Sequence, residues 1–234
     1  MMEKKAKKTV VCWSGGKDCC LALHRTLQEN HEVICLLSMV SDKDERNHAH
    51  GLKLKILSMQ AEALGIPLLM IDSAGEYEKS LKQALTRLKE QQGAEAVVFG
   101  SLYAREDRDW NENAARQAGL EPMFPIWIQE DETSRLLQDF ISLGYKSIVC
   151  RAHMKHFDSS WAGRYLDERF YSDIHHTQSC VMGENGEYHT FVLDGPKFHK
   201  RLTITASDVV LNSDLWSLDI QACELKDQET RHSG

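Results

Sequence analysis

The chain has 234 residues, of which 42% are hydrophobic and 27% charged, with a formal net charge of −7. This composition is typical of a soluble globular protein. The chain contains no run of about 18 apolar residues, so we expect no membrane span. The acidic balance argues against broad, sequence-independent nucleic-acid binding, which depends on many Lys and Arg contacts to phosphates. The seven cysteines include no C-x-x-C pair, so we expect free thiols, no zinc ribbon and a reducing, cytoplasmic location.

Strand and helix patterns alternate through about residue 128. Continuous apolar runs, typical of parallel strands covered on both faces, occupy residues 9–12, 32–40, 67–71, 96–100 and 123–128. Apolar residues at helical spacing predict a helix directly after residue 18 and further helices over residues 50–64, 77–92 and 107–118. This alternation predicts an α/β fold, a doubly wound parallel sheet whose ligands bind beyond the carboxyl ends of the strands. We expect this first domain to span residues 1–128.

The pattern changes after residue 128, where Pro125 and the acidic run at residues 129–132 mark a boundary. Helices are expected at residues 132–143 and 159–171, and extended stretches at residues 145–150, 188–193, 201–206 and 215–223. We therefore expect a second, smaller α+β domain over residues 129–226 that binds the substrate, followed by a polar tail at residues 227–234.

The first strand ends in the loop Ser14-Gly15-Gly16-Lys17-Asp18, and a helix follows at once. The two glycines let the backbone turn sharply and approach a ligand closely. Backbone amides at the start of a helix, with the helix dipole behind them, form a concavity suited to phosphate oxygens. Lys17 adds a positive charge and Ser14 a hydroxyl donor. We interpret the loop as a phosphate site; the alternative is the ordinary glycine turn that precedes many helices.

The loop is neither a Walker A motif nor a G-x-G-x-x-G dinucleotide fingerprint. It resembles the S-G-G-x-D-S pyrophosphate loop of the N-type ATP pyrophosphatases, which cleave ATP between its α- and β-phosphates. The nucleotide-binding candidates that this resemblance implies are Ser14, Gly15, Gly16, Lys17, Asp18, Cys19 and, in the second strand, Ser38. Cys19 stands where the family has Ser, and a thiol is the weaker hydrogen-bond donor.

A second informative stretch, residues 183–191, has the sequence G-E-N-G-E-Y-H-T-F. A turn with two glycines precedes an extended segment on which Glu187 and His189 face the same way. Together with Glu184, they could bind Mg²⁺, hold a cationic amine or act as a general base. The residues alone favour a polar hairpin turn with solvated carboxylates.

This stretch resembles the C-terminal signature of the diphthine–ammonia ligase family, a branch of the N-type ATP pyrophosphatases. The resemblance covers about residues 8–200, and its further matches, in the same order, are His50, Phe99-Gly100-Ser101, Arg108, Glu112, Gly163-Arg164 and Asp194-Gly195-Pro196. Ser101 stands where the family has Asp, which removes a carboxylate at the end of a strand.

The resemblance implies an ATP-dependent amide-forming ligase. A substrate carboxylate attacks the α-phosphorus of ATP that carries Mg²⁺, and ammonia or an amine then displaces AMP from the acyl-adenylate. The implied catalytic residues are Lys17, Glu184, Glu187 and His189. Asp18 is the candidate for the metal, although a helix N-cap explains Asp18 nearly as well.

The implied substrate contacts are His50, Ser101, Arg108, Glu112, Arg164, Asn185 and Thr190. In the family, the carboxylate belongs to diphthine, a modified histidine of a translation elongation factor, and ammonium supplies the nitrogen. A small metabolite is the alternative acceptor. A homo-oligomer is left open, whereas neither nucleic acid nor a membrane is expected as a partner.

Two other functions are left open. Sulfur transfer onto tRNA would keep the fold and use Cys19 or Cys180 as a persulfide carrier, but the missing C-x-x-C pair and the acidic charge argue against it. A non-catalytic nucleotide-binding protein would account for the departures at Cys19 and Ser101.

Overall fold

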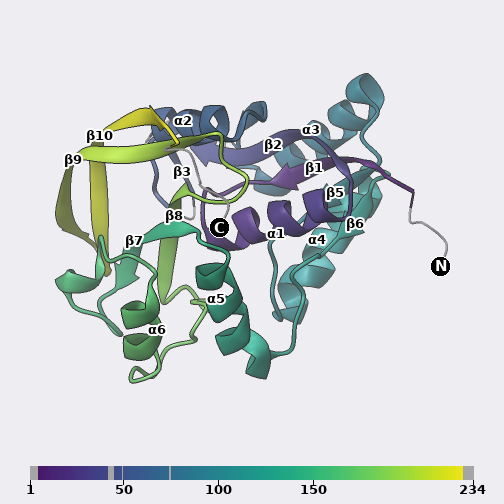
Figure 1. The fold of residues 1–234 in the computed structure, drawn as a ribbon. Coiled ribbons are helices and arrows are strands. Elements are labelled where there is room, and N and C mark those ends of the chain that lie inside the picture. Colours follow the sequence, from purple (N-terminus) through teal and green to yellow (C-terminus); the bar gives the residue numbers. More distant parts are fainter. Residues whose placement is uncertain (1–4, 42–44, 49, 74, 229–234) are drawn as a thin grey trace. The chain divides into compact units, whose positions relative to one another are not determined.

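A computed structural model describes residues 5–41, 45–48, 50–73 and 75–228 (Figure 1). Contacts divide the chain into two compact units, which we call the first and the second unit. The first unit consists of Met1–Ser14, Asp18–His48 and Ile66–Glu130. The second unit consists of Gly15–Lys17, Ala49–Gly65 and Asp131–Gly234. Two segments that the sequence assigns to the first domain, residues 15–17 and 49–65, thus group with the second unit.

The first unit is built on a parallel sheet, as the alternation of strands and helices predicts. In spatial order its parallel strands are β4 (Leu68–Asp72), β2 (Glu32–Ser41), β1 (Lys8–Cys12), β5 (Ala96–Val98) and β6 (Glu121–Met123). A short strand, β3 (Arg46–Asn47), pairs antiparallel with the end of β2. Because the chain order reverses at β1, the switch point lies between β1 and β5, and folds of this kind bind ligands at that point.

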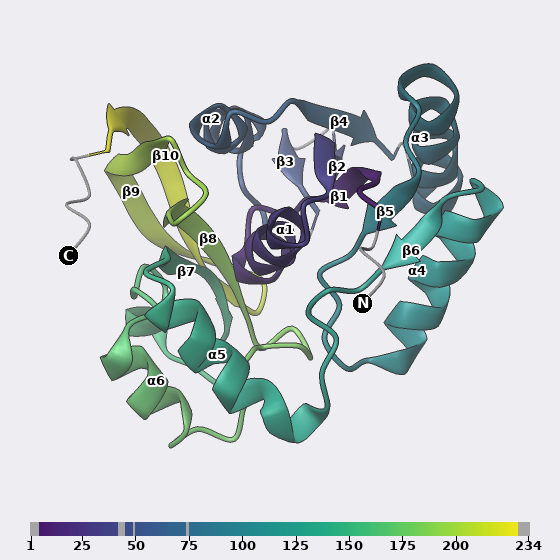
Figure 2. The ribbon, with the colours of Figure 1, turned by 45° about the vertical axis from the view of Figure 1, so that its right-hand side comes forward.

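Helices cover both faces of this sheet. The helices α3 (Tyr77–Gln92) and α4 (Arg105–Gln117) lie over one face, and their Leu85 and Ala115 belong to a buried cluster with Val10, Leu37 and Val97. The helix α1 (Lys17–Gln28) lies over the opposite face (Figure 2). At the switch point, Gly100 follows β5, and a Cβ on it would stand only 3.0 Å from the backbone nitrogen of Cys19.

The fifth parallel strand, β6, is shorter than the apolar pattern indicates and begins earlier in the sequence. It occupies Glu121–Met123 rather than residues 123–128, because Pro125 has no N–H to donate to a ladder. Pro122 lies inside the strand, which is tolerated because β6 is at the edge of the sheet. Helix α4 also starts earlier than expected, at Arg105.

The second unit contains an antiparallel sheet with the strand order β8, β7, β10, β9. Its strands are β7 (Lys146–His153), β8 (Tyr188–Asp194), β9 (Lys200–Asn212) and β10 (Leu215–Asp227). β9 and β10 form a long, curved hairpin (Figure 1), well beyond the short stretches at residues 201–206 and 215–223 that the sequence indicates. The expected polar tail therefore starts inside β10, and residues 229–234 lie outside the described residues.

In its described residues this unit has the α-helices α2 (Leu54–Leu64), α5 (Thr133–Ser142) and α6 (Glu168–Ile174). Helix α2 packs against β9 and β10, where the backbone nitrogen of His199 donates to Ala63 O at 2.7 Å and Lys200 Nζ reaches Glu62 Oε1 at 3.0 Å. In α5, Phe140 is fully buried and stacks on Tyr145 with ring centroids 4.7 Å apart.

The single helix expected over residues 159–171 is wrong. A short 3₁₀ turn at Ser159–Trp161 is followed by an extended segment, and α6 begins only at Glu168. The extended segment pairs with β7, because Val149 N donates to Arg164 O and Gly163 N donates to Val149 O, both at 2.8 Å. The segment is thus held by pairing with β7, which the helical spacing of its apolar residues does not reveal.

None of the helices in the described part of the chain is long and apolar enough to cross a membrane.

The close approach of Gly100 to α1 leads to a stability prediction. We expect Gly100→Ala to lower the free energy of unfolding by about 1–3 kcal/mol, because the new methyl group must push backbone away rather than a flexible side chain. Urea denaturation of the full chain measures this. Glu90→Ala, an exposed change in α3, is the control and should stay within about 0.5 kcal/mol of the unaltered chain; equal stabilities would contradict the tight packing.

Candidate functional site

The glycine loop between β1 and α1 is held by close packing of the chain. Gly15 has a φ of +86°, a conformation that L side chains rarely adopt, and a Cβ there would lie 2.9 Å from Leu57 Cδ2 and 3.0 Å from Gln60 Oε1. A Cβ on Gly16 would collide with the ring of His50. Both glycines are thus required by neighbouring protein atoms, in addition to any close approach by a ligand.

Strand β8 fixes the loop by hydrogen bonds within the second unit. Lys17 N donates to Thr190 Oγ1 at 3.0 Å, and Val192 N donates to Gly15 O at 3.0 Å. Gln60, which is fully buried in α2, donates from Nε2 to Gly15 O at 3.0 Å and to Val192 O at 2.7 Å. The backbone of the phosphate loop is therefore bonded to the signature strand directly, through Thr190 Oγ1 and Val192 N, and indirectly, through the side chain of Gln60.

Two uncharged histidines lie beside this junction, with ring centroids 4.9 Å apart. Burial lowers the pKa of His50 well below its usual range, and His189, Lys17 and Arg151 lower it further, against a hydrogen bond to Thr190. Burial lowers the pKa of His189 to about 4, helped by the same two cations and opposed by Glu187. His50 Nδ1 lies 2.7 Å from Thr190 O. Because a carbonyl oxygen only accepts, Nδ1 carries the proton and Nε2 carries the lone pair.

Arg151 belongs to this cluster, and nothing in the sequence singles it out. The β7–β8 register shifts between Val149 and Arg151, so that Arg151 rather than Cys150 lies opposite His189. Bulges of this kind often redirect a side chain next to a functional site. Gly51 makes room for the guanidinium, since a Cβ at that position, where φ is +65°, would collide with it.

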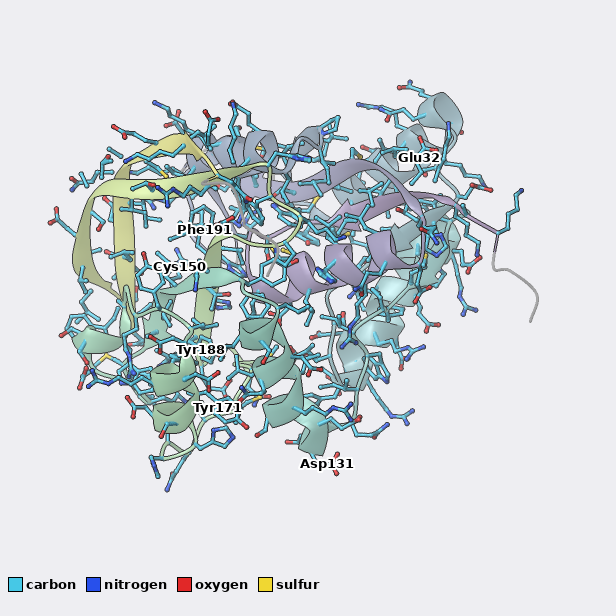
Figure 3. The ribbon with its side chains drawn as sticks, viewed as in Figure 1. Glu32, Asp131, Cys150, Tyr171, Tyr188 and Phe191 are labelled. Atoms are coloured by element: carbon cyan, nitrogen blue, oxygen red, sulfur yellow. The ribbon has the colours of Figure 1, made fainter. Side chains whose placement is uncertain are left out.

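Lys17 brings the second positive charge, on a side chain that is only 3% exposed. Its Nζ lies 5.0 Å from the ring centroid of Tyr188, the first residue of β8. Tyr188 and Phe191 lie on β8, next to Cys150 on β7 (Figure 3). The buried cation Lys17 and the half-buried cation Arg151, beside two neutral imidazoles, form an electropositive site that suits phosphate oxygens.

Glu187 organises the turn before β8. Its carboxylate accepts from Cys180 N at 2.8 Å, from Asn185 N at 2.9 Å and from Asn185 Nδ2 at 3.1 Å. Burial raises the pKa of Glu187, but these hydrogen bonds outweigh it, and the net pKa is lowered. Glu187 is thus a charged anchor for the turn, while Glu184 stays half-buried beside it.

The first unit contains the other candidates from the phosphate motif. Ser14 Oγ donates to Cys19 Sγ at 3.5 Å, so the residue that departs from the family pattern receives the loop hydroxyl. Asn47 Nδ2 donates to Ser14 O at 2.8 Å. Ser38 Oγ in β2 is buried with no hydrogen-bond partner among the described residues. Ser101 Oγ accepts from Asn111 Nδ2 at 3.1 Å.

Three other predicted substrate contacts are engaged by their own neighbours. In the first unit, Arg108 Nε donates to Glu112 Oε1 at 2.9 Å, and its guanidinium lies 4.8 Å from the Phe124 ring centroid. In the second unit, Arg164 donates to Asp173 Oδ2 at 2.6 Å and stacks on Trp161. Each arginine would have to exchange its partner to bind a carboxylate.

The described residues include no group of three or more His, Cys, Asp or Glu side chains placed to hold a metal ion. The residues around the loop therefore fit Mg²⁺ only in the way that the ion binds at nucleotide sites, where substrate phosphates and one or two carboxylates supply the ligands. Asp18, in the first turn of α1, is the carboxylate of the loop that could serve.

Comparisons with known protein families match both parts of the chain. The family model of the diphthamide synthase N-terminal domain matches residues 7–122, and that of the diphthamide synthase C-terminal domain matches residues 132–229.

Relatives similar to the chain include the diphthine–ammonia ligase of Danio rerio, 27% identical over 227 residues that cover 86% of this chain and 88% of the relative. The diphthine–ammonia ligase of Homo sapiens is 25% identical, with 86% of this chain and 84% of the relative covered. That of Schizosaccharomyces pombe is 27% identical and covers 90% of this chain, which matches 38% of that longer protein.

Among solved structures, the chain is similar to one described as a predicted subunit of a tRNA methyltransferase from Methanocaldococcus jannaschii. The TM-score is 0.42 at 13% identity, with 81% of this chain and 97% of the other covered. A similarity this distant carries no argument about function.

The two hydrogen bonds of Gln60 lead to a second prediction. We expect Gln60→Leu to destabilise the chain by about 1–3 kcal/mol, because it removes the donor shared by two carbonyl groups in a buried site. Chemical denaturation measures the loss. Ser58→Ala, on the exposed side of the same helix, is the matched control and should change the stability by less than about 0.5 kcal/mol. A Gln60→Leu chain as stable as the control would rule out the anchoring role.

The lowered pKa values of the histidines predict a pH dependence of stability. The unfolded chain binds a proton at His189 near pH 6.5, whereas the folded chain does so only at about pH 4. The free energy of unfolding should therefore fall as the pH drops through this interval, by about 2–3 kcal/mol from His189. His189→Asn should make the profile shallower relative to its value at pH 8. An unchanged slope would contradict a neutral His189 in the folded chain.

Proposed function

Because the chain belongs to the diphthamide synthase family, we propose that it is an ATP-dependent ligase that converts the carboxylate of diphthine into an amide with ammonia as nitrogen donor. Diphthine is a modified histidine of a translation elongation factor, which would be the macromolecular partner. The observation that carries the proposal is the attachment of the loop Gly15–Lys17 to strand β8 beside Arg151 and the two neutral histidines.

The proposed reaction has two steps. In the first, a carboxylate oxygen of diphthine attacks the α-phosphorus of ATP in line, the bond to the β-phosphate oxygen breaks, and pyrophosphate leaves. In the second, ammonia attacks the carbonyl carbon of the acyl-adenylate, AMP leaves, and one proton is released. Positioning and charge stabilisation supply most of the catalysis in phosphoryl and adenylyl chemistry of this kind.

Lys17 and Arg151 are proposed to stabilise the charge that develops on the leaving pyrophosphate. Both are cations placed before the reaction starts, and preorganised donors in a desolvated site commonly contribute about 3–4 kcal/mol each to the transition state. The loop amides of residues 14–18 add donors at the start of α1. Mg²⁺, held by the phosphates and Asp18, would neutralise further phosphate charge.

His50 and His189 are proposed to serve as neutral acceptors. Both are unprotonated at neutral pH, and the lone pair of His50 is on Nε2 because Nδ1 is bound to Thr190 O. Anionic phosphates nearby would raise both pKa values, since an opposite charge favours the protonated form. His189 is thereby suited to accept the proton that ammonia releases. Glu187 keeps the turn before β8 in place and is proposed as a positioning residue.

The remaining candidates are proposed for recognition of the substrate. Ser38 offers an unsatisfied hydroxyl to the nucleotide, and Ser101, Arg108 and Glu112 are candidates for contacts with diphthine. Arg164, Asn185 and Glu184 are the candidates from the second unit. The seven cysteines are all free thiols, which supports a reducing, cytoplasmic location for this reaction.

The test is product analysis of the full chain with ATP, Mg²⁺, ammonium and an elongation factor that carries diphthine. We expect AMP and pyrophosphate in equal amounts, together with the amide. Lys17→Met should lower kcat by about 10²–10³-fold, whereas Lys82→Met, an exposed change in α3, should leave it unaltered. ADP and orthophosphate as products, or full activity of Lys17→Met, would overturn the proposal.

A further inference from the structure

The ring of Tyr188 is fixed from several sides within the second unit. Tyr188 is the first residue of β8 and is only 1% exposed. Its hydroxyl donates to Val181 O at 2.6 Å, and the rings of Phe157 and Phe170 meet it edge-on, with centroids 6.2 and 5.5 Å away. A Cβ on Gly183 would lie 2.8 Å from the ring, so this glycine leaves the ring its space. Because protein interiors are closely packed, the ring cannot tilt without displacing these neighbours.

One face of this ring lies against the ammonium group of Lys17. Lys17 Nζ lies over the ring, 5.0 Å from its centroid, and an aromatic face attracts a cation within about 6 Å. Lys17 is 3% exposed, so water screens this attraction only weakly. An aromatic face carries no net charge. It therefore holds the ammonium group without cancelling the positive charge that an anion would meet.

Strand β8 thus contacts Lys17 at both ends. The backbone nitrogen of Lys17 donates to Thr190 Oγ1 at 3.0 Å, and its Nζ lies over Tyr188. Residues two apart on a strand point to the same face, so Tyr188 and Thr190 present their side chains side by side. A lysine side chain has many rotamers, and a contact that restricts them reduces the entropy lost when the ammonium group binds an anion.

We propose that Tyr188 is a positioning residue, whose ring holds the ammonium group of Lys17 in place for the phosphates of ATP. This step rests on the proposed function, in which Lys17 stabilises the charge on the leaving pyrophosphate. Tyr188 acts through Lys17 rather than on the reacting atoms. A ring that only filled the core would depend on its shape alone, whereas a cation–π contact depends on the electron density of the ring face. Experiments that change one property and keep the other therefore separate the two roles.

The contact itself is tested by NMR of the full chain with isotope-labelled lysine. Protons over an aromatic face are shifted upfield by the ring current. The ε-methylene resonance of Lys17, assigned with Lys17→Met, should therefore lie upfield of those of exposed lysines. Tyr188→Phe should keep this shift and Tyr188→Leu should remove it. A Lys17 resonance at the position of exposed lysines would overturn the proposal, and the unaltered chain decides this even if the leucine variant does not fold.

Fluorination changes the ring face and keeps its shape nearly constant. Phenylalanine with one, two or three fluorine atoms is incorporated at position 188, with Tyr188→Phe as the reference, and calorimetry measures the Kd for ATP with Mg²⁺. Each fluorine withdraws electron density from the ring face, so we expect Kd to rise stepwise, by about 2- to 30-fold in total. The same series at Phe140, which is fully buried and stacks on Tyr145, is the matched control and should leave Kd unchanged. A Kd that does not follow the fluorine series at position 188 would overturn the proposal.

A second background shows whether the ring acts through Lys17. The Lys17→Met chain lacks the ammonium group, so the fluorine series at position 188 should have no further effect on Kd, and a double-mutant cycle measures this coupling. Thermal unfolding shows that each variant is folded. A fluorine series that weakens ATP binding equally in the Lys17→Met chain would assign the effect to packing and overturn the proposal.

Activity distinguishes this proposal from the proposed function. If Kd for ATP follows the fluorine series but the chain forms no AMP, pyrophosphate and amide with diphthine and ammonium, the positioning role stands and the ligase assignment fails. If the amide forms while kcat and Kd stay constant across the series, the ligase assignment stands and the positioning role fails. When both hold, kcat should fall by about 2- to 30-fold across the series, with a smaller effect on KM for the diphthine substrate, because the weakened contact acts on the phosphates.

Discussion

The attachment of the glycine loop to strand β8 is the constraint on which the site depends. A loop of two glycines is flexible by itself, yet here Gly15 O accepts from both Gln60 and Val192, and Lys17 N donates to Thr190. Each of these groups is buried, so breaking one bond would leave a polar atom unsatisfied at a cost of about 1–3 kcal/mol. The loop therefore keeps one conformation, and the backbone of Lys17 has a fixed position.

Because the loop is rigid, the charged groups and the histidines beside it keep a fixed arrangement. Two cations, Lys17 and Arg151, are held beside His50 and His189, which respond by staying neutral. Four basic side chains thus contribute only two positive charges in the absence of a ligand, and the histidines can take up protons when phosphate charge arrives. The register shift in β7 contributes to this arrangement. With a regular register, Cys150 rather than Arg151 would lie opposite His189.

The sequence predicts the parallel sheet and the loop because both are encoded locally. Apolar runs that alternate with helical spacing indicate the strands and helices, and Gly65 and Gly93 end their helices as expected. The helix over residues 159–171 fails because pairing with β7 is a distant interaction that outweighs local spacing. The role of Gln60 could not be predicted either. It is a polar residue among the buried positions of α2, and its hydrogen-bond partners lie 45 and 132 residues away in the sequence. Arg151 depends on a register shift, which no local pattern reveals.

The local charge around the glycine loop differs from the net charge of the chain. The second unit gathers cations and neutral imidazoles around the loop, where a polyanion is favoured. A net charge of −7 conceals this local basic site, because it sums the site into an acidic whole. The acidic balance of the sequence therefore argues against broad binding of nucleic acid, yet it does not argue against a phosphate site formed by a few side chains that distant parts of the sequence bring together.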